Sequence, residues 1–163
     1  MDITIRIAES SDAPAVHTYY AKLLEEKIPY IRDNPTPSIE DEIKFVQNFV
    51  DGPGDLLLAL DGTTVIGMLG IERSGHYQES HRIHIGISIQ KEYRAKGLGT
   101  QLLNEATEWA VNNGIHSIEL EVIAANPAVK LYKSLGYNVV GRISNGFKVN
   151  NEYYDVLHMQ LIL

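Results

Sequence analysis

The chain has 163 residues, of which 44% are hydrophobic and 21% charged, a composition typical of one globular domain covering residues 1–163. Its 14 basic and 21 acidic residues give a net charge of -7, which argues against nucleic acid or an anionic membrane as partner and favours a cationic small molecule. The lack of cysteine excludes disulfides and a cysteine nucleophile, and the lack of a long apolar run or a signal peptide makes a cytoplasmic location the expectation.

The first half of the chain predicts a strand, two helices and a hairpin. Cap residues and an early proline mark the first helix, a run with three prolines must be a loop, and Asp61-Gly62 is a strong hairpin signal. The predicted elements are a strand at 3–7, helices at about 12–26 and 38–50 with a loop at 28–38 between them, and strands at 56–60 and 64–72.

The second half predicts a strand and a helix twice, and then a closing hairpin. The elements are a strand at 84–89, a helix from Leu98 to about 111, a strand at 117–122, a helix from Pro127 to Gly136, and strands at 139–149 and 152–163. This order predicts an α/β (mixed α+β) fold with one mixed sheet and helices on both faces. The strands ending near residues 89 and 124 should be parallel, because a helix joins them.

The segment from Arg94 to Thr100 joins a strand to a helix through Gly97 and Gly99. The first N–H groups of a helix lack intrahelical partners and lie at the positive end of its dipole, so this junction can bind an anion. Glycine lets the anion approach closely, and Arg94 and Lys96 add positive charge. Taken alone, the pattern also fits an ordinary tight turn.

Two common phosphate-binding loops do not fit this segment. The dinucleotide fingerprint requires a third glycine where this chain has Leu102, and the P-loop requires Gly-Lys followed by Ser or Thr. What the segment does contain is Arg-x-x-Gly-x-Gly. A second segment, from Ala125 to Tyr137, is similar to Asn-x-x-Ala-x-x-Leu-Tyr-x-x-x-Gly-Phe. With these two motifs, the chain resembles the GNAT family of N-acetyltransferases. The resemblance is specific from about residue 83 to 137.

The resemblance implies a fold, an activity and a set of cosubstrate contacts. It implies a mostly antiparallel sheet whose two parallel strands splay apart around the pantetheine arm of acetyl-CoA. It also implies transfer of the acetyl group, by direct attack, to a primary amine of a small molecule, peptide or protein. The expected acetyl-CoA contacts are Ile87, Ser88, Ile89, Arg94, Lys96, Gly97, Leu98, Gly99, Thr100, Asn126 and Tyr132. Asn126 lies one residue later than the family's asparagine, so it either binds pantetheine or caps the next helix.

Acetyl transfer needs a neutral amine and a proton for the leaving thiolate. The resemblance implies that Tyr132 is the general acid, although its apolar helix neighbours also suit a core tyrosine. His84 stands where relatives often carry a glutamate and could be the general base, directly or through water. Glu119 and Glu72 are alternative bases, and a structural histidine also fits.

The acceptor site is expected around the first two helices and their loop. Tyr30 and Glu26, with Glu72, are candidates for acceptor binding. Tyr19, Tyr20, Glu25 and Asp33 could add to an aromatic and acidic wall for a cationic amine. The residues of the first helices equally fit a solvated helix surface. No metal site is expected, because His81 and His84 point to opposite faces of their strand. A homodimer is possible. The alternative function is that of a regulatory domain of the same fold that binds acyl-CoA without turnover.

Overall fold

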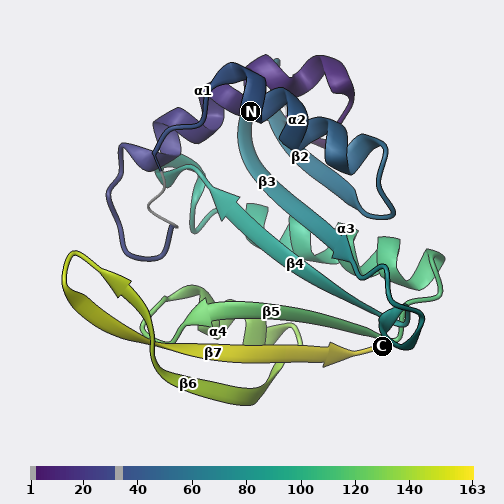
Figure 1. The fold of residues 1–163 in the computed structure, drawn as a ribbon, viewed down its shortest axis with the longest axis vertical. Coiled ribbons are helices and arrows are strands. Elements are labelled where there is room, and N and C mark those ends of the chain that lie inside the picture. The colour runs from purple at the N-terminus through teal and green to yellow at the C-terminus, as the bar shows by residue number, and fades with distance from the viewer. Residues whose placement is uncertain (1–2, 32–34) are drawn as a thin grey trace.

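A computed structural model describes residues 3–31 and 35–163, which form a sheet flanked by helices (Figure 1). The strands are β1 (Ile3–Ile7), β2 (Asp55–Asp61), β3 (Thr64–Arg73), β4 (Arg82–Ile89), β5 (Ser117–Ile123), β6 (Asn138–Val149) and β7 (Glu152–Ile162). The helices are α1 (Ala13–Leu24), α2 (Ile39–Val50), α3 (Leu98–Asn112) and α4 (Ala128–Ser134). Among the described residues, no helix is both long and apolar enough to span a membrane.

All seven strands belong to one sheet, in the order β1-β2-β3-β4-β5-β7-β6. Among the strands of residues 3–31 and 35–163, only the β4–β5 pair is parallel, and every other pairing is antiparallel. Two tight turns set the register of the hairpins: Gly62 has φ +62° between β2 and β3, and Asn150 and Asn151 have φ +49° and +63° between β6 and β7. The predicted order of elements and the mixed sheet are therefore confirmed.

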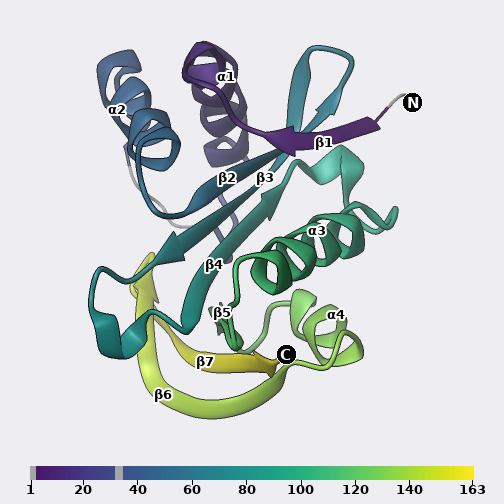
Figure 2. The same ribbon diagram turned by 90° about the vertical axis from the view of Figure 1, so that its right-hand side faces the viewer.

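The helices cover opposite faces of the sheet, α1 and α2 on one and α3 and α4 on the other (Figure 2). A cluster of buried side chains lies under each layer. The cluster with α1 and α2 includes Val16, Val46 and Leu58, and the cluster with α3 includes Leu102, Ile85 and Ile118. Because strand side chains alternate between faces, Ile83 and Ile85 face α3, while His84 and Ser88 face the side of α1.

Candidate active site

The strands β4 and β5 pair over a short stretch and then separate. Arg82, Ile83 and His84 pair with Ser117, Ile118 and Glu119, whereas β4 stays paired with β3 as far as Ile89. Within the described residues, the facing edges of β4 and β5 beyond His84 and Glu119 have no strand partner, and they diverge in Figure 1. Backbone groups along these edges can bond an extended ligand or water. We call this space the opening between β4 and β5.

The loop before α3 presents backbone donors on one side of the opening. Ala95 and Gly97 have left-handed φ angles of +55° and +86°, and Gly97 is the N-cap of α3 with no side-chain cap bond. Gln101 N donates to Gly97 O at 3.1 Å, and this bond opens the helical hydrogen-bond pattern of α3. The N–H groups of Leu98 to Thr100 therefore remain available to an anion at the positive end of the helix.

The two glycines of this loop have different functions in the structure. A Cβ on Gly97 would meet nothing within 4 Å, so its glycine is required by the backbone angle and keeps the approach open. A Cβ on Gly99 would lie 3.0 Å from Leu131 Cδ2 and 3.5 Å from Ile89 Cδ1. Gly99 therefore allows α3, α4 and the end of β4 to pack closely. Its contact with the pyrophosphate stays a prediction.

The two cations of the loop are placed differently. Arg94 donates from Nε to Ile89 O at 2.8 Å, and its Nη2 lies 2.6 Å from Glu26 Oε2 in an ion pair. The guanidinium is thus held between β4 and the segment after α1. Lys96 is exposed, with Nζ 5.9 Å from the centre of the Tyr93 ring, and its contact with a pyrophosphate stays a prediction.

Tyr132 lies on α4 and is 6% exposed, packed in the core cluster that also contains Leu98 and Leu120. Its ring centre is 6.0 Å from that of Tyr137. Burial raises the pKa of Tyr132 to about 12, and its hydroxyl has no hydrogen bond to another residue in the described part of the chain. The phenol therefore keeps its proton at neutral pH and can donate it to a ligand.

The three candidate bases form a row across adjacent strands. In the register, Glu72 of β3 is paired with His84 of β4, which is paired with Glu119 of β5. All three line a cavity of about 390 Å³, together with Glu121 and His158. Cross-strand neighbours on one face have their side chains within reach of one another. The structure therefore brings together residues 47 positions apart in the sequence, at the point where the strands begin to separate.

Among the described residues, Arg82 forms a hydrogen bond with one of the two carboxylates of this row, Glu119, and not with the other, Glu72. Its Nη1 donates to Glu119 Oε2 at 2.7 Å, its Nη2 donates to Glu79 at 2.7 Å, and Gln160 donates to the other oxygen of Glu119 at 3.2 Å. The Glu119 carboxylate is thus held in place by donors on both of its oxygens. Within residues 3–31 and 35–163, the side chains of His84 and Glu72 have no such partner, so they are the freer proton acceptors of the row.

Asn126 caps the short helix α4. Its Oδ1 accepts a hydrogen bond from Ala128 N at 2.9 Å, which satisfies one of the first N–H groups of the helix. This contact corresponds to the second of the two roles that the sequence left open. A role in binding pantetheine stays a prediction.

We expect Asn126→Ala to lower the free energy of unfolding by about 1 kcal/mol, the usual cost of a lost cap, and to leave acetyl-CoA affinity nearly unchanged. Urea unfolding and calorimetric titration measure the two quantities. Asn126→Asp keeps the acceptor oxygen and serves as the control. A large loss of affinity at unchanged stability would instead assign Asn126 to the pantetheine arm.

The acceptor candidates from the first helices are only partly brought together. Tyr19 is buried and its hydroxyl is 2.9 Å from Ser88 Oγ, Tyr20 is half-buried, and Glu25 is exposed. Glu26 is ion-paired with Arg94, and Tyr30 donates to Ala125 O at 3.3 Å. Asp33 lies outside the described residues.

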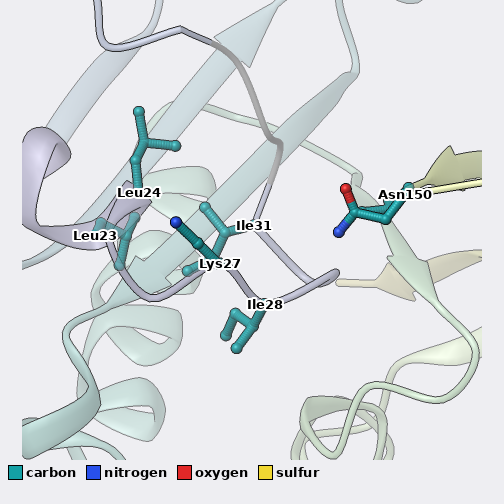
Figure 3. A pocket seen from close by; sticks show the side chains of 7 residues that line it. Leu23, Leu24, Lys27, Ile28, Ile31 and Asn150 are labelled. Atoms are coloured by element: carbon teal, nitrogen blue, oxygen red, sulfur yellow. The ribbon is translucent and has the colours of Figure 1, made fainter.

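A second pocket, which the sequence did not indicate, lies between the end of α1 and the tip of the β6–β7 hairpin. Its volume is about 300 Å³. Figure 3 shows the side chains that line it. Aliphatic side chains and two polar ones line it: Leu23, Leu24, Ile28, Ile31, Val149, Lys27 and Asn150. No sequence signal could have found it, because it joins segments more than 100 residues apart.

Known proteins resemble this chain over its full length. The family model described as "Acetyltransferase (GNAT) family" matches residues 13–137. The L-amino acid N-acetyltransferase AaaT of Escherichia coli is 29% identical over 97% of this chain and 96% of its own length. A GNAT-family acetyltransferase from Streptococcus pneumoniae has a TM-score of 0.92, with 26% identity over 99% of this chain and 100% of its own. A phosphinothricin acetyltransferase from Sinorhizobium meliloti, solved with acetyl-CoA, has a TM-score of 0.87 and 21% identity over 100% of this chain and 89% of its own. The chain therefore belongs to the GNAT family of acetyl-CoA-dependent N-acetyltransferases.

Proposed function

We propose that this chain transfers the acetyl group of acetyl-CoA directly to the neutral primary amine of a small molecule, within the opening between β4 and β5. The observation that carries the proposal is the geometry of this opening: pairing stops after His84 and Glu119, and the open N–H groups of α3 lie at its side. A slot with unpaired strand edges suits the extended pantetheine arm, and the helix N-terminus suits its pyrophosphate.

The reaction needs one group that takes a proton and one that gives a proton. The amine nitrogen attacks the thioester carbonyl carbon, the C–S bond breaks, and the thiolate takes a proton from the Tyr132 hydroxyl. His84, directly or through water, accepts the proton that the amine loses. Both side chains then return to their starting forms by exchange with solvent. The need for a base depends on the acceptor, since deprotonating a lysine-like amine near pH 7 costs about 4.6 kcal/mol and an α-amine about 1 kcal/mol.

The acceptor that we favour is a free amino acid with an apolar side chain. The pocket beside α1 has aliphatic walls for such a side chain, and it has Lys27 for a carboxylate. The relative AaaT, which matches nearly the whole chain, is named for L-amino acids. An α-amine also places the smaller demand on the base.

Two-substrate kinetics with a panel of amines tests this proposal. The panel holds leucine, methionine, aspartate, a polyamine and a lysine-containing peptide. We expect intersecting double-reciprocal lines, no acetylated enzyme by intact mass, and the highest kcat/KM for leucine or methionine. Parallel lines with an acetylated enzyme would contradict direct attack, and preference for the polyamine or the peptide would contradict the proposed acceptor.

The pH dependence of the rate tests the proposed base. If His84 accepts the proton, the rate should show an acidic limb, because a protonated imidazole cannot act as a base. His84→Gln should remove or shift this acidic limb, and Glu72→Gln should leave it in place. With a pKa of about 12, Tyr132 stays protonated and adds no alkaline limb below about pH 10. The profile is best taken with a high-pKa amine, whose own titration does not overlap. An unchanged limb and rate in His84→Gln would rule out the histidine as base.

A further inference from the structure

Residues 26–30 follow α1 and reach both sides of the opening between β4 and β5. Glu26 contacts the loop that leads from β4 to α3, and Tyr30 contacts the turn between β5 and α4. Lys27 and Ile28, between them, line the pocket beside α1 (Figure 3). We call residues 26–30 the strap. It is a short stretch of chain that contacts the loop before α3, the pocket beside α1 and the turn between β5 and α4.

On the β4 side, one carboxylate makes two contacts. Glu26 Oε2 is 2.6 Å from Arg94 Nη2, and Glu26 Oε1 accepts from Lys91 N at 3.1 Å. Arg94 is in turn fixed to the end of β4 through its bond to Ile89 O. The side chains of Glu26 and Arg94 are 13% and 34% exposed, so this ion pair is partly shielded from solvent.

On the β5 side, the contact is a single hydrogen bond. The Tyr30 hydroxyl donates to Ala125 O at 3.3 Å, in the turn that leads into α4 and Tyr132. Tyr30 is 38% exposed, so its removal should not disturb the core. Between the two contacts, Lys27 has a left-handed φ of +48°, a strained angle for a residue that is not glycine. A strained backbone persists where its surroundings hold it, and here both ends of the strap are held.

We propose that Glu26 and Tyr30 are positioning residues, which hold the strap across the opening between β4 and β5. They thereby fix the pocket beside α1, where the acceptor is proposed to bind, relative to bound acetyl-CoA. Arg94 serves this arrangement through Glu26 and is not a principal ligand of the pyrophosphate. The inference rests on the proposed function, because it concerns the acceptor of that reaction. It assigns Glu26 and Tyr30 to the placement of the acceptor pocket and not to direct contact with the acceptor.

The test compares Glu26→Gln, Arg94→Gln and their double variant, with KM measured for each substrate. Loss of a shielded charge-assisted contact should raise the acceptor KM about tenfold in each single variant, with acetyl-CoA KM within about twofold of wild type. Because the two residues act as one unit, the double variant should resemble either single variant. Tyr30→Phe should raise the acceptor KM in the same direction.

The matched control is Glu92→Gln. It removes the ion pair of Glu92 with Lys22, at 3.6 Å, which links α1 to the segment before α3. The two side chains are 60% and 52% exposed, so no change in either KM is expected. A raised acetyl-CoA KM in Arg94→Gln, with the acceptor KM unchanged in Glu26→Gln and Tyr30→Phe, would overturn the proposal. If wild type acetylates no amine at all, the proposed function fails instead, so the two failures can be distinguished.

Discussion

Tyr132→Phe is expected to lower kcat by about 10²–10⁴-fold, while the dissociation constant of acetyl-CoA changes little. The hydroxyl acts on a thiolate that forms only as the C–S bond breaks, so its loss affects the transition state and not the bound ground state. The raised pKa of about 12 keeps the phenol protonated, ready to donate. Steady-state rates and calorimetric titration of acetyl-CoA measure the two effects separately.

The neighbouring Tyr137 supplies the control for this change. It is also buried, its ring lies 6.0 Å from that of Tyr132, and its buried hydroxyl has no hydrogen-bond partner in the described part of the chain. Removing an unsatisfied buried hydroxyl costs little, so Tyr137→Phe should keep both stability and kcat near wild type. Equal turnover in Tyr132→Phe and wild type would return Tyr132 to a purely structural role.

Gly97→Val is expected to weaken acetyl-CoA binding by about 100-fold or more. A β-branched residue is strained at φ +86°, and relief of the strain would turn the first N–H groups of α3 away from the pyrophosphate. The new side chain would also occupy the open space beside these donors. The affinity for acetyl-CoA and the free energy of unfolding should both be measured.

Gly114→Val controls for the strain alone. Gly114 has φ +68° at the other end of α3, and a Cβ there also meets nothing within 4 Å, so the same substitution should destabilise the fold without changing acetyl-CoA affinity. Equal losses of affinity in the two variants would mean that Gly97 acts through stability only. Unchanged affinity in Gly97→Val would remove the pyrophosphate from this loop.

Local patterns in the sequence were sufficient to predict most of the fold. The alternation of residues 3–7, the turn at Asp61-Gly62 and the prolines of the loop after α1 each act over a few residues, so their elements could be located closely. The order β5-β7-β6 and the separation of β4 from β5 depend on pairing between distant segments. The separation was expected only because the chain resembles a known family.

In the candidate site too, some features follow from the sequence and others depend on contacts between distant segments. The sequence named His84, Glu119 and Glu72 as candidate bases, and the structure pairs them in register on adjacent strands. The bond of Arg82 to Glu119 and the ion pair of Arg94 with Glu26 join residues 37 and 68 positions apart, and no local pattern encodes such partners. The sequence therefore supplied the candidate residues, whereas the partners of these residues, and with them the strap, came from the structure.

Thiol release from acetyl-CoA by the wild-type protein, followed with and without each amine of the panel, tests the central claim most directly. The same samples are analysed by mass spectrometry for the acetylated amine, and calorimetry records the binding of CoA. We predict thiol release that depends on the amine and matches the acetylated product one to one. Tight binding of CoA without release for every amine would contradict the account, and would instead indicate a regulatory domain that binds acyl-CoA without turnover.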